Sequence, residues 1–179
     1  MIRAYYYGQV SFQDRQVGRL LTCLEKHGLL ENTIVLYAAD HGEMLGDFGF
    51  FAKGCFYKGS VNVPLLLRHP ASFPGGIRSD ALCGLQDILP TLAAMAGIPL
   101  PAPVDGVDLL PHLRTGCAVR DNYVAYYGDE PRQLYMVADH EHKYCYSQVG
   151  GIEELYDRRR DPDELENVAS RPENAGLVR

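Results

Sequence analysis

The 179-residue sequence lacks the features that mark several large protein classes. No apolar run approaches the roughly 20 residues that a membrane-spanning helix needs, so no membrane partner is expected. The net charge is −6, and Lys and Arg form no clustered stripe, which argues against nucleic acid as a partner. The first residues, MIRAYYYGQV, lack the charged and apolar regions of a signal peptide. The chain is nevertheless long enough to bury a hydrophobic core.

The cysteines also exclude two kinds of small domain. There are five of them, an odd number, and no two form a CxxC pair. Neither a zinc knuckle nor a disulfide scaffold is therefore indicated, and a reducing compartment such as the cytoplasm is favoured.

What the sequence does contain is most distinctive at residues 34–53, IVLYAADHGEMLGDFGFFAK. Residues 34–39 form a short apolar run, which predicts a buried strand. The run ends abruptly in Asp40 and His41, at the end of a strand where open α/β sheets bind ligands. Gly42 then permits a sharp turn without a Cβ penalty. This junction is the first candidate for a functional site.

The first two thirds of the chain have an α/β pattern. Helical spacing of apolar residues predicts a helix over 9–27 with Gly28 at its end, and a short loop joins it to the strand. A helix followed by such a strand is half of a βαβ crossover, and the absent preceding strand suggests a fragment. A second buried strand is predicted at 63–67 and a further helix at 85–96, with Asp87 as its cap.

The character of the sequence changes near residue 120. Three short strand-like runs follow, which predict a small antiparallel sheet, and residues 152–170 have the composition of a polar, helix-prone tail. We therefore expect an α/β part at 1–120 and a small subdomain at 121–179.

The residues after the first strand suggest metal and anion binding. A carboxylate and an imidazole suit Ca²⁺, Mg²⁺, Mn²⁺ or Zn²⁺, although Asp40 and His41 are too few for a closed site. Lys53 follows on a glycine-punctuated loop, where its ammonium could bind an anionic oxygen. Glu43 and Asp47 are expected to fix this loop through hydrogen bonds to backbone.

Taken together, these segments resemble the C-terminal part of a sulfatase, within the alkaline-phosphatase-like superfamily. The resemblance covers about residues 5–170 and rests on ordered pieces. They are the helix and strand leading into ADHGEMLGDFGFFAKG, then LQDILPTLAAMAGIPLPAPVDGVDLLPHLRTG, and finally LYMVADHEHKY with ELYDRRRDPDELENVA. It implies a partial alkaline-phosphatase-like sheet with flanking helices, plus a small C-terminal α+β subdomain with antiparallel strands.

The resemblance also implies roles for individual residues. Asp40 matches a metal-binding aspartate of the family, and His41 matches the adjacent position, which is Asn or His in different members. Lys53 matches a lysine that contacts the sulfate group and the leaving oxygen. In such enzymes a divalent cation, usually Ca²⁺, polarises the sulfate ester and supports a formylglycine nucleophile made from Cys or Ser.

The sequence does not contain that nucleophile. Its motif in the family, C/S-x-P/A-x-R, is absent, as are the paired aspartates and the upstream histidine and lysine that complete the site. Two protein ligands are far fewer than the roughly six to eight that Ca²⁺ takes. We therefore predict that this chain alone binds metal weakly and hydrolyses no ester.

Three functions stay open from the sequence. The first is part of a sulfatase acting on a small organic sulfate ester, and the second is a phosphate or phosphonate ester hydrolase of the same superfamily. The third is a non-catalytic binding or interaction domain. A fragment would expose the surfaces that its missing half covers, so self-association is expected, most simply as a symmetric dimer.

Overall fold

The computed structural model describes residues 1–100 and 102–178. Its helices are α1 (Ile2–Lys26), α2 (Lys58–Val61), α3 (Ile88–Ala96) and α4 (Leu110–Thr115), and its strands are β1 (Val35–Ala38), β2 (Leu65–Arg68), β3 (Tyr123–Tyr127), β4 (Leu134–Ala138), β5 (His142–Ser147) and β6 (Ile152–Asp157). Short 3₁₀ turns lie at Leu30–Asn32, Asp47–Gly49, Leu85–Asp87, Val149–Gly151 and Pro172–Asn174. No helix in these described ranges combines the length and apolar character needed to cross a membrane.

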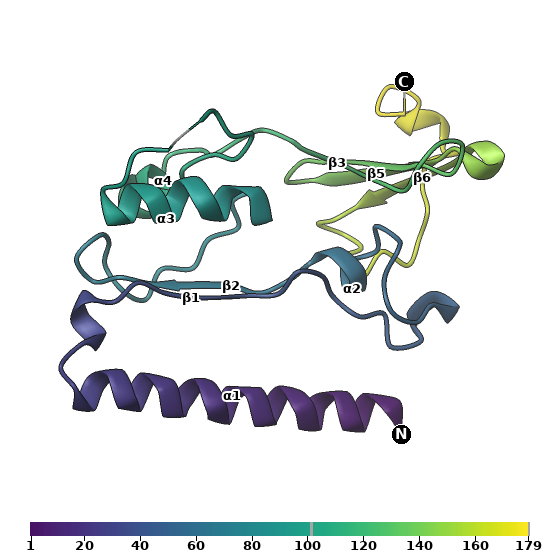
Figure 1. The fold of residues 1–179 in the computed structure, drawn as a ribbon. Helices are drawn as coiled ribbons and strands as arrows, with labels where there is room; N and C mark the ends of the chain where they lie inside the picture. The colour runs from purple at the N-terminus through teal and green to yellow at the C-terminus, as the bar shows by residue number, and fades with distance from the viewer. Residues whose placement is uncertain (101, 179) are drawn as a thin grey trace.

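The first part of the chain forms three layers. In Figure 1, α1 runs beneath the β1–β2 pair, while α3 and α4 lie above it. A small core joins the upper layers, in which Phe73, Met95 and Leu110 are buried against Leu67 of β2. The layering places the end of β1 beside α2 and the loop that precedes it (Figure 1).

Helix α1 starts earlier than the apolar spacing predicts, at Ile2, and ends where expected. Gly28 adopts a left-handed φ of 67°, which a glycine reaches without steric cost, directly after the last helical turn. The helix buries no residue completely, and Leu20, which the predicted apolar face includes, is exposed. Val17, Leu21 and Leu24 are partly buried, so only part of the predicted apolar face is covered.

The two strands of the first part were expected to be buried, and they are only partly so. Strands β1 and β2 pair antiparallel, with Leu36 opposite Leu67, and no further strand in the described residues joins them. Leu66 is exposed because it lines an open cleft that α1 also borders, and both edges of this two-stranded sheet are open. The second strand also begins two residues later than predicted.

The second part of the chain is a four-stranded antiparallel meander in the order β3–β4–β5–β6. The prediction of an antiparallel sheet is confirmed, but the sheet has four strands and not three. Residues 152–157 were predicted to belong to a helix-prone tail, which was wrong, since they pair with β5 along their whole length. Burial of Leu155 and Tyr156 favours the strand over the helical tendency of the two glutamates before them.

Candidate functional site

Asp40 and His41 follow β1, as the sequence predicts. The His41 Nδ1 lies 2.8 Å from the Gly42 carbonyl oxygen, and because a carbonyl only accepts, Nδ1 carries the proton. In the neutral imidazole the lone pair is then on Nε2, which lies 3.5 Å from the Asp40 carboxylate. The Asp40 side chain is 86% exposed. The two residues thus present a carboxylate oxygen and an imidazole nitrogen side by side.

Gly42 is needed for a reason that the sequence did not reveal. A Cβ at this position would lie 2.0 Å from the carbonyl oxygen of Gly59, closer than any real contact. The Gly42 N–H donates to the Ser60 carbonyl at 2.7 Å. Gly42 therefore allows close approach of α2, and its φ is not in the left-handed region that a sharp turn would require.

The loop after Gly42 is fixed by its own backbone and by Glu43. The Glu43 carboxylate accepts hydrogen bonds from the Leu45 N–H at 3.1 Å and from the Ala52 N–H at 2.6 Å. The Met44 N–H donates to the Ala52 carbonyl at 2.9 Å, and the Met44 side chain is buried. The predicted structural role of Glu43 is confirmed. Asp47 instead pairs with Arg3 of α1, so it ties the loop to a helix and not to backbone.

Lys53 follows Ala52 at the far end of this loop and is exposed. It lines the same open cleft as Asp40 and His41, a space of about 1670 Å³ bordered by α1, the β1–β2 sheet and the β3–β6 sheet. Its ammonium forms no ion pair with any residue that the structure describes. The potential metal ligands Asp40 and His41 and the cation of Lys53 therefore line one cleft.

The donor set at this site is incomplete for a metal ion. Over residues 1–100 and 102–178, no group of three or more His, Cys, Asp and Glu side chains is arranged to hold one. The proton on Nδ1 of His41 does fit a ligand role, because metal-binding histidines commonly donate their other ring N–H to a carbonyl. The residues present therefore suit one side of a divalent cation.

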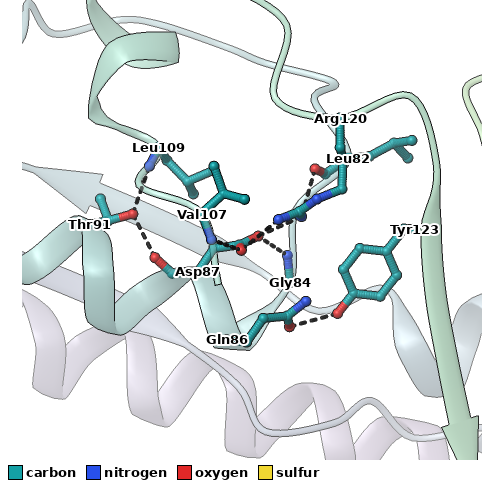
Figure 2. Close-up of polar contacts among 9 residues, drawn as sticks. All are labelled: Leu82, Gly84, Gln86, Asp87, Thr91, Val107, Leu109, Arg120 and Tyr123. Carbon is teal, nitrogen blue, oxygen red and sulfur yellow. Dashed lines mark hydrogen bonds and ion pairs between the residues drawn. The ribbon is translucent and has the colours of Figure 1, made fainter. Parts of the chain in front are cut away.

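Sequence reasoning missed the polar network around Asp87, which Figure 2 shows. Asp87 was predicted to cap a helix, and its side chain does form the acidic half of a capping box in the turn before α3. That side chain is also 0% exposed and accepts hydrogen bonds from both terminal guanidinium nitrogens of Arg120 at 2.7 Å. The N–H groups of Gly84 and Val107 also donate to it, each at 2.8 Å. The network joins the start of α3, the segment before α4 and the segment before β3.

This network also controls the charge of Asp87. Burial raises the pKa of Asp87, but the hydrogen bonds from Arg120, Val107 and Gly84 outweigh it, so the pKa lies below its usual value. The Tyr123 hydroxyl donates to Gln86 at 2.7 Å, and the Arg120 guanidinium lies 5.4 Å from the Tyr123 ring centre. Through Gln86 and Arg120, Tyr123, the first residue of β3, is thus attached to the turn that precedes α3 (Figure 2).

A second missed feature is a buried ion pair between Lys143 of β5 and Glu164 of the C-terminal segment. The alternation of side chains along β5 could have revealed that Lys143 is buried, since Lys143 and Cys145 share the inward face. The other partner follows Asp161-Pro162 with no local sign of burial. This pair lies against the segment that follows Lys53.

Comparison with known proteins shows the family of this chain. A family model described as N-sulphoglucosamine sulphohydrolase, C-terminal, matches residues 46–179. The chain belongs to the sulfatase family. The expected C-terminal sulfatase portion and the expected alkaline-phosphatase-like fold class are both confirmed.

Three individual similarities cover nearly the whole of this chain. The arylsulfatase of Clostridium perfringens (strain 13 / Type A) is 34% identical over 178 residues, which cover 96% of this chain and 36% of that protein. The structure of BT4656 in complex with its substrate D-glucosamine-2-N,6-O-disulfate has a TM-score of 0.84 and 30% identity, covering 92% of this chain and 35% of that one. The phosphonate monoester hydrolase of Agrobacterium radiobacter has a TM-score of 0.86 and 31% identity, and the match covers 99% of this chain and 39% of that one. This chain spans about a third of the length of the curated relatives it matches.

Proposed function

We propose that this sulfatase-family chain contributes one side of a metal-dependent site that hydrolyses an organic sulfate ester. The observation that carries the proposal is the shared cleft of Asp40, His41 and Lys53. In this arrangement Asp40 and Nε2 of His41 bind the divalent cation, and Lys53 contacts the sulfate group. The similarity to an arylsulfatase and to a protein solved with a sulfated sugar as its substrate supports this choice of ester.

Ca²⁺ is proposed as the cation from the family resemblance, and Mn²⁺, Mg²⁺ and Zn²⁺ are alternatives for a carboxylate and an imidazole nitrogen. Bound there, it would polarise the sulfate ester. Asp40 is exposed enough to reach the ion, and the Gly42 carbonyl fixes the orientation of His41. Lys53 would act as a compact point charge toward the anionic oxygens of the ester.

The chain is expected to be inactive alone, because two protein ligands are too few to hold Ca²⁺ firmly and no C/S-x-P/A-x-R motif supplies a nucleophile. Calcium titration of the purified 179-residue chain by calorimetry should give a dissociation constant in the millimolar range. Asp40→Asn should abolish the binding heat, while the exposed Asp105→Asn should leave it unchanged. Metal-dependent turnover of 4-nitrophenyl sulfate by this chain would contradict the expectation.

A phosphate or phosphonate ester hydrolase is the second candidate, since a phosphonate monoester hydrolase is as similar in structure as the first-named sulfated-sugar complex. The deciding experiment uses the protein translated from the whole reading frame that contains this sequence. It compares kcat/KM for 4-nitrophenyl sulfate with that for a 4-nitrophenyl phosphonate monoester. Preference for the sulfate supports our proposal, and the reverse preference supports the second candidate. Hydrolysis of neither, with metal still bound, supports a non-catalytic binding domain.

A further inference from the structure

The buried ion pair between Lys143 and Glu164 lies where the C-terminal subdomain meets the loop that contains Lys53. The two residues are 4% and 5% exposed. Each also contacts the loop: Lys143 Nζ donates to the Phe56 carbonyl at 2.6 Å, and Glu164 Oε2 accepts from the Lys58 N–H at 2.8 Å. Both contacts are to backbone, so they fix the path of the chain three and five residues after Lys53.

The opposite side of the loop is fixed as well. Ala52 is hydrogen-bonded to Glu43 through its N–H and to Met44 through its carbonyl. Lys53 therefore follows one anchored residue directly and precedes another anchored residue, Phe56, by three positions. With an anchor on each side, the backbone that positions the Lys53 ammonium has restricted freedom.

Further contacts strengthen the second anchor. The Tyr57 hydroxyl donates to Glu154 of β6 at 2.7 Å, and the Tyr57 ring stacks on Phe48 with centroids 4.5 Å apart. The Lys58 ammonium reaches the Pro162 carbonyl at 3.0 Å. The segment after Lys53 is thus bound by β5, by β6 and by the C-terminal segment.

The backbone of Glu164 is strained. Its φ is +61°, in the left-handed region that non-glycine residues rarely adopt. That conformation brings the Cβ of an L-residue too close to its own backbone. Such strain persists only where the surroundings fix it, and here it places the carboxylate between Lys143 and the Lys58 N–H.

We propose that Lys143 and Glu164 are positioning residues for Lys53, and that the C-terminal subdomain acts on the site through them. The pair fixes the backbone after Lys53, so the ammonium stays on the cleft side that it shares with Asp40 and His41. What Lys53 binds rests on the proposed function above. The fixing of the loop does not depend on it.

The first test measures backbone motion in the 179-residue chain by ¹⁵N relaxation. In the unmodified protein, amides of residues 53–57 should have order parameters near 0.85, the value of rigid backbone. In Glu164→Gln they should fall below about 0.6, while residues 124 and 136 on β3 and β4 stay rigid. The matched control is Asp163→Asn, which removes only an exposed partner of Lys58 and should change nothing.

A second variant guards against misfolding. The double substitution Lys143→Met/Glu164→Leu removes both charges at once, and buried ion pairs replaced by apolar residues commonly leave a protein folded. It should loosen residues 53–57 as Glu164→Gln does. The proposal is overturned if either variant leaves the loop rigid, or if either loosens β3 and β4 to the same extent as the loop.

The second test uses the protein translated from the whole reading frame and measures hydrolysis of 4-nitrophenyl sulfate. Glu164→Gln should lower kcat/KM by roughly 10- to 100-fold, the loss expected when a catalytic contact is misplaced by about 1 Å. Adding it to Lys53→Met should lower kcat/KM no further. If the two losses in kcat/KM multiply in the double variant, Glu164 acts independently of Lys53 and the proposal is refuted. If the unmodified protein hydrolyses nothing, the proposed function fails and the relaxation data alone decide the positioning role.

Discussion

Replacing Arg120 with methionine should destabilise the chain strongly, because it leaves a buried carboxylate without its counter-charge. Asp87 receives four hydrogen bonds, two of them from the Arg120 guanidinium at 2.7 Å. After the substitution only the N–H groups of Gly84 and Val107 remain. The Leu82 carbonyl also loses its donor, Arg120 Nη1, at 3.1 Å.

The size of the effect follows from the burial. Removing one partner of a buried ion pair typically costs about 3–5 kcal/mol, and we take the lower end because the Arg120 side chain is 16% exposed. A loss of about 3 kcal/mol lowers the melting temperature of a chain of this size by about 6–12 °C. Arg120→Lys should cost less than methionine but should not match arginine, since lysine cannot donate the bidentate pair.

Urea unfolding followed by far-ultraviolet circular dichroism at pH 7 measures this free energy. The matched control is Arg159→Met, which removes an exposed arginine paired with Glu141 at 2.9 Å and should cost below about 1 kcal/mol. A double-mutant cycle with Asp87→Asn isolates the coupling between the two side chains. If Arg120→Met costs no more than Arg159→Met, the Asp87 network does not stabilise this fold and the reasoning is refuted.

Three further outcomes are expected. The pKa of Asp87 is lower in the folded chain than in the unfolded one, so the stabilisation from its carboxylate is complete above about pH 4 and is lost as the pH falls through the folded pKa. The difference in unfolding free energy between the unmodified chain and Asp87→Asn should therefore shrink on acidification. A constant difference from pH 6 to pH 2 would count against this. Gly42→Ala should cost about 2–3 kcal/mol because its Cβ meets the Gly59 carbonyl at 2.0 Å, whereas Gly75→Ala, with open space around it, should stay within about 0.5 kcal/mol in the same urea assay. Light scattering from micromolar to millimolar concentration should show self-association through the exposed surfaces, and a monomer throughout would exclude it.

The elements that local pattern determines were predictable from the sequence. Residues 34–39 predicted a strand that the structure places at Val35–Ala38. The helix predicted to end at residue 96 does end there, and Gly97 follows it with a left-handed φ of 66°. Strand β6 was not predictable in this way, because Glu153 and Glu154 favour a helix locally. In the structure their carboxylates accept hydrogen bonds from Tyr144 and Tyr57, contacts that only the folded chain provides.

The site residues were likewise predictable only where a local pattern or a family resemblance marked them. Asp40 and His41 could be found because they end an apolar strand, and Lys53 because a family resemblance pointed to it. Their metal and sulfate roles stay predictions. The buried charges could not be found, since Arg120 is 33 residues from Asp87 and nothing near either residue signals the pairing. The boundary expected near residue 120 also stays a prediction, although the four-stranded sheet begins at Tyr123.

The hydrogen bond from Tyr57 to Glu154 makes the loop after Lys53 visible to ultraviolet spectroscopy. Burial, followed by this bond, raises the pKa of Tyr57 to about 12, and burial with the Glu153 bond raises the pKa of Tyr144 to about 12. Burial also raises the pKa of Tyr156. The chain has 12 tyrosines and no tryptophan, so tyrosinate absorbance in an alkaline titration is free of indole overlap. These three phenols should ionise above the usual pKa of tyrosine, and Tyr57→Phe identifies the part of that high-pH signal that belongs to the loop.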